Sequence, residues 1–104
     1  MAADGEKQMA VDSEAIVLAL QGEIDLTAAP ALACALLDAE VSGGRITVDL
    51  GGVEFMDCSG LRLLLEANSR CNENGCQLSL LRGPRQVQRV FEMTGTLNRF
   101  VFDD

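Results

Sequence analysis

Three reactive side chains follow one another near the middle of this 104-residue chain. Asp57, Cys58 and Ser59 bring a carboxylate, a thiol and a hydroxyl group together. A serine hydroxyl in such a place can accept a phosphoryl group, whereas a serine or cysteine nucleophile in an enzyme needs a base beside it. The chain contains no histidine, so Ser–His and Cys–His catalytic pairs are excluded. The residues therefore favour phosphoryl acceptance, and we do not expect an enzyme.

A helix is predicted to begin at these residues. Leu61 and Leu64 start an apolar stripe at helical spacing, and the Asn-Gly pair at 74–75 is typical of a helix end. Asp57 is placed to cap this helix, with the Ser59 hydroxyl at its exposed rim near the first-turn amides. The positive end of the helix would stabilise a phosphate there, while nearby carboxylates would repel it. We expect a phosphate on Ser59 to alter a contact with a partner protein; the alternative is that Ser59 only caps the helix.

Strands and helices alternate along the chain. Apolar patterns predict strands at 9–11, 15–20, 46–50, 78–80 and 100–102 and helices at about 28–41, 59–74 and 87–94. Thr27 is expected to cap the first helix, the run 15–20 to be a buried strand, and the glycine pair at 51–52 to end the third strand. This order predicts an α/β fold with a mixed, largely parallel sheet of about four or five strands and helices packed on it. We expect a single domain over residues 1–104, with a flexible segment at 1–8.

The carboxyl ends of neighbouring parallel strands should bring two loops together. These loops are 23–27, after the second strand, and 51–60, after the third. Phe55 and Met56 are expected to anchor the second loop in the core, and Gly60 to leave space for another surface to approach the backbone. The two loops also carry the carboxylates expected to surround Ser59, namely Glu23, Asp25, Glu54 and Asp57.

The charge balance narrows the choice of partners. Sixteen acidic residues against eight basic ones give a net charge of -8, which repels nucleic acid backbones and favours a partner with a basic surface. No apolar segment is long enough to span a membrane, and the N-terminus lacks the pattern of a signal peptide. We therefore expect a cytoplasmic protein that binds neither nucleic acid nor membrane.

The four cysteines are predicted to be reduced, buried side chains. They are Cys34, Cys58, Cys71 and Cys76, and the spacing of the last two does not match a zinc site. No metal or cofactor is expected. Two alternatives stay open: a redox switch in which Cys71 forms a disulfide with Cys76 or Cys58, and a module that binds a nucleotide or small anion without being phosphorylated.

Three segments carry a family likeness. Gly-Glu-Ile-Asp occurs at 22–25, Val-Glu-Phe-Met-Asp-Cys-Ser-Gly-Leu at 53–61, and Val-Phe-Glu-Met-Thr-Gly at 90–95. Across roughly residues 8–102 the chain resembles the STAS domain of anti-sigma factor antagonists. Either of the first two segments alone would be a weak signal, but the two together at this separation are specific.

The resemblance implies a regulatory cycle. Members of this family bind an anti-sigma factor that is also a serine kinase, and thereby free a sigma factor for transcription. The kinase phosphorylates the serine that corresponds to Ser59, which releases the antagonist, and a PP2C-type phosphatase restores it. The contact surface implied by the resemblance comprises Asp25, Thr27, Asp57, Cys58, Gly60, Leu61 and Arg62.

The chain departs from the family pattern at three places. Cys58 stands where family members often have serine or threonine, so a thiol adjoins the expected phosphoacceptor. Thr96 is one residue more than is usual between Gly95 and the last strand. Many members also continue into a further helix beyond the position of Asp104.

Overall fold

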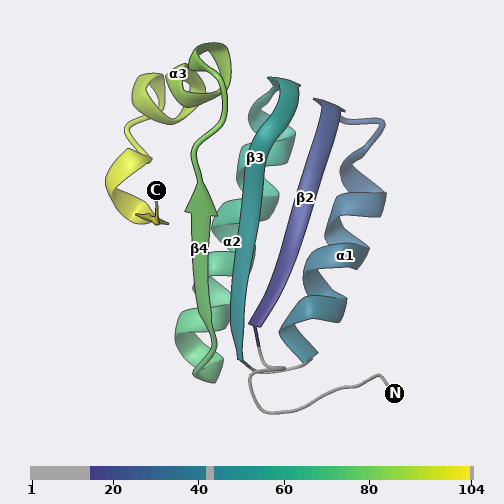
Figure 1. Ribbon diagram of the computed structural model, residues 1–104, viewed down its shortest axis with the longest axis vertical. Helices are drawn as coiled ribbons and strands as arrows, with labels where there is room; N and C mark the ends of the chain where they lie inside the picture. The colour runs from purple at the N-terminus through teal and green to yellow at the C-terminus, as the bar shows by residue number, and fades with distance from the viewer. Residues whose placement is uncertain (1–14, 42–43, 104) are drawn as a thin grey trace.

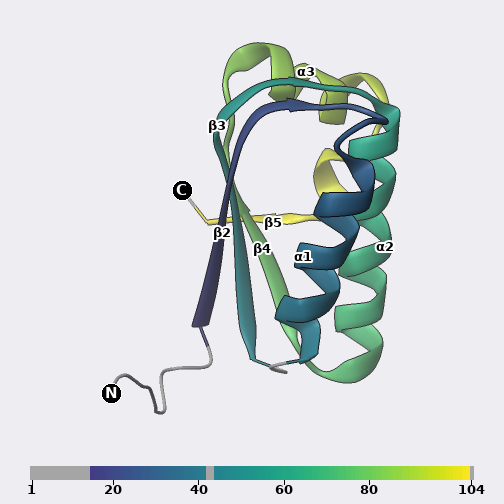
Figure 2. The same cartoon turned by 90° about the vertical axis from the view of Figure 1, so that its right-hand side faces the viewer.

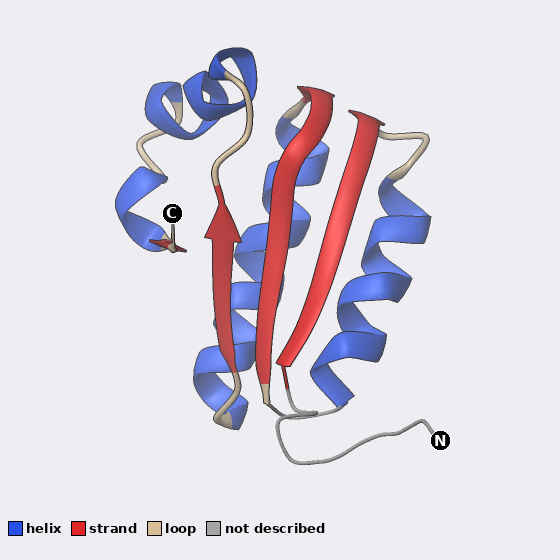
Figure 3. Cartoon of the chain, viewed as in Figure 1, coloured by secondary structure: helices blue, strands red, loops and turns tan. Residues whose placement is uncertain are grey.

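The computed structural model describes residues 15–41 and 44–103. The predicted strand at 9–11 and the segment 1–8 lie outside the described residues. Helices and strands alternate as the sequence predicts (Figures 1 and 3). The elements are β2 (Ala15–Ile24), α1 (Ala29–Val41), β3 (Arg45–Met56), α2 (Cys58–Asn74), β4 (Gln77–Leu81), α3 (Arg85–Met93), the short 3-10 helix η2 (Leu97–Arg99) and β5 (Val101–Phe102).

The described strands form one sheet in the order β2-β3-β4-β5, and each neighbouring pair is parallel. Helices α1 and α2 lie on one face of this sheet, and α3 lies across the end at which β3 and β4 finish (Figure 2). Ile46, Val48 and Leu50 are completely or almost completely buried, as their alternation with polar residues indicates. The predicted α/β fold with a largely parallel sheet is therefore confirmed.

The two long helices present the apolar stripes that their sequences predict. In α1 the buried residues are Leu32, Leu36 and Ala39. In α2 they include Leu61, Leu64, Ala67 and Cys71, and the helix ends at Gly75. The φ angle of Gly75 is 86°, a left-handed conformation that glycine adopts without steric cost, which explains the helix end at this residue.

An ion pair joins the two helices. The Arg70 side chain of α2 donates two hydrogen bonds to Glu40 of α1, from Nε to Oε1 at 2.7 Å and from Nη2 to Oε2 at 2.9 Å. This paired geometry raises the pKa of Arg70 above its ordinary value. The pair fixes the separation of the two helices that cover the sheet.

The first described strand differs from the prediction in length and in burial. β2 continues through Glu23 to Ile24, so the expected polar turn begins only at Asp25. Within β2 only Ile24 is buried, and Val17 is 63% exposed. The prediction of a buried strand at 15–20 is therefore wrong. Its physical reason is position: β2 is the outermost strand of the described sheet, and α1 and α2 cover only one of its faces (Figure 2).

The glycine pair at 51–52 does not end β3, contrary to the prediction. The strand register shifts twice, between Ala19 and Gln21 and between Gly22 and Glu23, and each shift gives β3 one residue more than β2. Such bulges change which side chains face inward. As a result Leu50, Val53 and Met56, three positions apart, are all buried, and β3 runs on to Met56.

Aromatic contacts hold the C-terminal segment in place. The ring of Phe91 in α3 meets Phe100 and Phe102 edge-on, with centroids 5.4 and 5.6 Å apart. Thr96, the additional residue before η2, is buried, and its backbone N–H donates to the carbonyl of Phe91 at 3.0 Å. The fourth phenylalanine, Phe55, takes no part in this cluster and is 49% exposed.

Candidate functional site

The ends of β2 and β3 meet, as the sequence predicts. Ile24 and Met56 are partners in the sheet register, and both side chains are buried. The backbone N–H of Asp57 donates to the carbonyl of Ile24 at 3.2 Å. The turn after β2 and the start of α2 are therefore joined directly, and Ser59 lies beside this junction.

Asp57 caps α2. Its backbone is extended, with φ at -105° and ψ at -172°, and its Oδ1 accepts the N–H groups of Ser59 at 2.9 Å and Gly60 at 3.4 Å. An aspartate at this position satisfies amides that have no partner within the helix. The predicted cap is confirmed.

Ser59 is bonded to the same carboxylate oxygen. Its Oγ donates to Asp57 Oδ1 at 2.5 Å, and the residue is partly exposed. This hydrogen bond is the largest of the causes that hold the pKa of Asp57 below its ordinary value of 3.8. Asp57 is therefore ionised at neutral pH, and its carboxylate holds the Ser59 hydroxyl in a defined orientation.

The first-turn amides are not free for a phosphate. The sequence led us to expect that they would stabilise a charge on Ser59, but the amides of Ser59 and Gly60 already bond Asp57. A phosphoryl group on Ser59 would instead replace the hydroxyl proton that Asp57 now binds. It would bring negative charge against a carboxylate, so repulsion outweighs helix-end stabilisation here.

A second aspartate stabilises the turn that leads into α1. Asp25 Oδ1 accepts the N–H groups of Thr27 at 3.0 Å and Ala28 at 3.2 Å, both in the turn before Ala29. Thr27 contributes its backbone N–H to this turn and has an exposed side chain, so the prediction that Thr27 caps α1 is wrong. An aspartate competes well for such turn amides because its carboxylate is short and charged.

Two residues of the predicted contact surface belong to the core. A Cβ atom on Gly60 would lie 2.7 Å from Ile24 Cγ2 and 3.1 Å from Met56 Cγ, so the protein's own side chains fill the space that we expected to be open. Leu61 is only 4% exposed. Neither residue offers a side chain to a partner in this structure, whereas Thr27, Cys58 and Arg62 are exposed.

All charged side chains in the two segments that form the junction are acidic. Residues 21–28 and 51–60 contain no lysine or arginine. Their four carboxylates fall within two positions of the Ile24–Met56 pair along the chain. These residues are Glu23, Asp25, Glu54 and Asp57.

The sequence did not predict that two large apolar side chains beside this junction would be exposed. Leu26 in the turn after β2 is 75% exposed, and Phe55 near the end of β3 is 49% exposed. We expected Phe55 to be anchored in the core with Met56, and only Met56 is buried. The three-residue spacing of Leu50, Val53 and Met56 is the sequence signal that leaves Phe55 outside.

The cysteines divide into two pairs. Cys34 and Cys58 are exposed, so the prediction of burial is wrong for them, while Cys71 and Cys76 are buried. Burial, together with a hydrogen bond that the Cys71 thiol donates to the Cys76 side chain, raises the pKa of Cys71 to about 12. A thiol with so high a pKa forms little of the thiolate that reacts with oxidants, which disfavours a redox switch at this pair.

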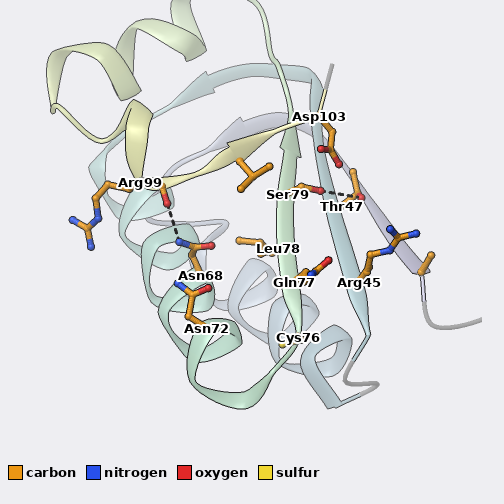
Figure 4. Close-up of a pocket in the computed structure, with 12 residues that line it drawn as sticks. Arg45, Thr47, Asn68, Asn72, Cys76, Gln77, Leu78, Ser79, Arg99 and Asp103 are labelled. Atoms are coloured by element: carbon orange, nitrogen blue, oxygen red, sulfur yellow. Dashed lines mark hydrogen bonds between the residues drawn. The ribbon is translucent and has the colours of Figure 1, made fainter.

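A pocket of about 600 Å³ lies beside β4 (Figure 4), and Ser59 is not among the residues that line it. Asn68 and Asn72 of α2, together with Gln77, line it, and Asn68 Nδ2 donates to the carbonyl of Arg99 at 2.9 Å. The guanidinium groups of Arg45 and Arg99 point to opposite sides of β4 (Figure 4). The two cationic side chains that line the pocket therefore do not converge on one point within it.

The described residues contain neither a cluster of metal ligands nor a membrane-spanning helix. Within 15–41 and 44–103, no group of three or more cysteine, aspartate or glutamate side chains is arranged to hold a metal ion. No helix in this part of the chain has the length and apolarity needed to cross a membrane.

Comparison with known proteins points to one family. The family model described as "Mlab, STAS domain" matches residues 8–101. An anti-sigma-B factor antagonist of Staphylococcus aureus is 35% identical over 75 residues, which cover 71% of this chain and 69% of the relative.

Solved structures share the fold. The anti-sigma factor antagonist SpoIIAA in its unphosphorylated form aligns with a TM-score of 0.73 at 22% identity, covering 88% of this chain and 82% of that one. The STAS domain of a SulP transporter from Vibrio cholerae aligns with a TM-score of 0.60 at 18% identity, covering 92% and 78%. At such identities the likeness concerns the fold alone.

Proposed function

Because the chain belongs to the STAS domain family, we propose that it is an anti-sigma factor antagonist switched off by phosphorylation of Ser59. One observation carries this proposal: the Ser59 hydroxyl is partly exposed and bonded to the ionised carboxylate of Asp57, at a junction whose segments 21–28 and 51–60 contain carboxylates but no lysine or arginine. A single domain then carries the function, in the cytoplasm where sigma factors act.

One similarity supports this assignment. The relative from Staphylococcus aureus is named an anti-sigma-B factor antagonist, and its match with this chain covers more than two thirds of both. The fold shared with SpoIIAA is consistent with it.

The partner is an anti-sigma factor that is a serine kinase. Asp57 accepts the hydrogen bond of the Ser59 hydroxyl and so holds this hydroxyl in place for phosphoryl transfer. The kinase supplies ATP and the catalytic groups, so the antagonist is a substrate and a binding protein rather than an enzyme. A PP2C-type phosphatase removes the phosphate and returns the antagonist to its binding form.

Release follows from charge. A phosphoserine adds roughly two negative charges. These charges face the Asp57 carboxylate across the distance of a former hydrogen bond, in a contact already rich in acids. Asp25, Thr27, Cys58 and Arg62 form the remaining contact surface that we propose around Ser59.

The test is phosphorylation with site mapping. The chain is incubated with ATP and each anti-sigma factor kinase of its own genome, and phosphopeptides are mapped by mass spectrometry. We expect phosphate on Ser59 in the wild type and none in Ser59→Ala, which should still bind the kinase. Phosphate at another residue, or none with any kinase, would refute the proposal.

Binding of Ser59→Glu completes the test. The added carboxylate imitates part of the phosphate charge and should weaken binding of the kinase by about tenfold or more, since like charges brought together cost several kcal/mol. Equal affinities of the wild type and Ser59→Glu would show that charge at this position does not control release.

A further inference from the structure

We propose that Phe55 and Leu26 form an apolar docking surface for the kinase that phosphorylates Ser59. This inference rests on the proposed function and adds to it the residues that carry the binding energy. Neither residue belongs to the contact surface inferred from the family resemblance.

No other described segment covers these two side chains: the bulges in the β2–β3 pairing turn Phe55 outward, and Leu26 lies in the turn after β2. Phe100 and Phe91 are buried and Phe102 packs against the core, whereas Phe55 keeps 49% of its surface open. Leu26 is 75% exposed. Singly exposed apolar side chains are common, and what distinguishes these two is their place at the strand ends that meet beside Ser59.

Both residues lie next to Ser59 in space. Ile24 and Met56 are register partners, and both approach Gly60, the residue after Ser59. Phe55 precedes Met56 and Leu26 follows Ile24 by two positions, so their Cα atoms lie within about 4 and 8 Å of those of that pair. Both residues therefore stand at the strand ends that meet beside the hydroxyl, with Phe55 turned away from the buried side to which Met56 points.

A kinase acting on Ser59 must cover this neighbourhood. Phosphoryl transfer requires the attacking hydroxyl to be held in line with the phosphate. A stable protein interface buries about 800 Å² on each partner. An interface of that size centred on Ser59 includes residues a few positions from the Ile24–Met56 pair, and exposed aromatic side chains near its centre carry much of the binding energy.

The charges around the surface describe the partner. Phe55 and Leu26 stand among Glu23, Asp25 and Glu54, with no lysine or arginine in either segment. The matching surface is an apolar pocket bordered by arginine or lysine. A second copy of this chain fits poorly, because a two-fold contact here would set carboxylates against carboxylates.

The experiment compares two single variants with a matched control. Phe55→Ala and Leu26→Ala remove the proposed contacts. Val41→Ala removes an equally apolar side chain, 87% exposed, at the far end of α1. The 13-residue helix α1 separates that end from the Leu26 turn by about 20 Å. Affinity for the ADP-bound kinase and the kcat and KM of Ser59 phosphorylation are measured for each.

We expect Phe55→Ala and Leu26→Ala to bind at least tenfold more weakly and to raise KM, with kcat nearly unchanged, while Val41→Ala matches the wild type. Affinities within twofold of wild type for both variants would overturn the docking surface. Phe55→Arg keeps a long side chain but sets a cation against a basic partner, so it must weaken binding as well. This variant replaces Phe55→Ala in the test if Phe55→Ala is poorly folded.

The outcomes separate this inference from the function on which it rests. A wild type that binds and is phosphorylated on Ser59, beside variants of equal affinity, refutes only the docking surface. A wild type that binds no kinase refutes the proposed function and the docking surface with it. Self-association of the wild type that Phe55→Ala abolishes, seen by sedimentation, would assign the surface to a second copy instead.

Discussion

The Ser59 hydroxyl and the Asp57 carboxylate share one hydrogen bond of 2.5 Å, and the same carboxylate oxygen caps α2. The proposed phosphoacceptor and the helix cap are therefore joined through one carboxylate. Any group placed on Ser59 Oγ removes a donor from Asp57 and adds charge beside it. This coupling allows one covalent change to alter both the charge and the local bonding of the proposed contact surface.

The stability contributed by Asp57 depends on pH. Its pKa in the folded chain lies below 3.8, chiefly because Ser59 donates to it. A lowered folded pKa contributes stability that is complete above the unfolded value and is lost as the pH falls through the folded one. Ser59→Ala should thus be less stable than wild type at neutral pH, and the difference should shrink below pH 3.8. Urea unfolding over a pH series measures it.

The control for this prediction is Ser69→Ala, an exposed substitution on the same helix. Its stability relative to wild type should not change with pH in this range. If the difference in stability between wild type and Ser59→Ala were the same in acid as at neutral pH, the hydrogen bond would not favour the ionised carboxylate.

Gly60→Ala should destabilise the fold although alanine favours helices. The new methyl group would lie 2.7 Å from Ile24 Cγ2, closer than carbon atoms pack. Overpacking of this kind typically costs about 1 to 3 kcal/mol, whereas alanine in place of glycine in an open helix gains about 1 kcal/mol. Thermal and urea unfolding of Gly60→Ala, with Ser69→Ala as the control, show whether the substitution lowers or raises the free energy of unfolding. A Gly60→Ala protein as stable as wild type would mean that the junction of β2 and α2 yields without cost.

The Arg70–Glu40 pair should stabilise the packing of α1 on α2. Glu40 is 10% exposed and Arg70 37%, so Arg70→Met leaves a nearly buried carboxylate without donors. We expect a loss of about 1 kcal/mol, at the lower end for charged hydrogen bonds because water screens Arg70. The stability of Arg70→Lys should lie between that of wild type and that of Arg70→Met, since lysine keeps the charge but cannot donate two parallel hydrogen bonds. A double-mutant cycle with Glu40→Gln isolates the coupling, and zero coupling would contradict this role.

The thiols should react in two classes. Cys34 and Cys58 are exposed and should be labelled quickly by a disulfide reagent, while Cys71 and Cys76 should react only when the chain unfolds. For Cys71 the pKa of about 12 adds to the protection by burial. Thiol titration in native buffer and in urea, with the labelled residues mapped, measures this. A Cys71–Cys76 disulfide formed in the folded protein by mild oxidation would restore the redox alternative.

Local sequence signals predicted the elements and the cap. The alternation of Ile46, Val48 and Leu50 and the leucine stripe of α2 follow from strand and helix periodicity. Asp57 was identified as a cap because its side chain reaches amides two and three positions away, an interaction within one short segment. Such features need no knowledge of the rest of the fold.

Errors arose where distant segments decide the outcome. The glycine pair at 51–52 resembles a strand end, yet pairing with β2 carries β3 through it by means of bulges. The same bulges turn Phe55 outward and Val53 inward. Thr27 does not cap α1, because the chain leaves β2 only after Ile24 and the backbone N–H of Thr27 is bound by Asp25 in the turn before the helix.

The order of residues along the chain was sufficient for the α/β fold, for the helix that begins after Asp57, and for Ser59 as the hydroxyl of interest. Pairing of β2 with β3 was needed to decide which side chains surround that hydroxyl. It closed the space over Gly60, buried Leu61 and left Phe55 and Leu26 in solvent. Periodicity is a property of one segment, whereas exposure depends on which other segment covers it, and only the folded chain sets that.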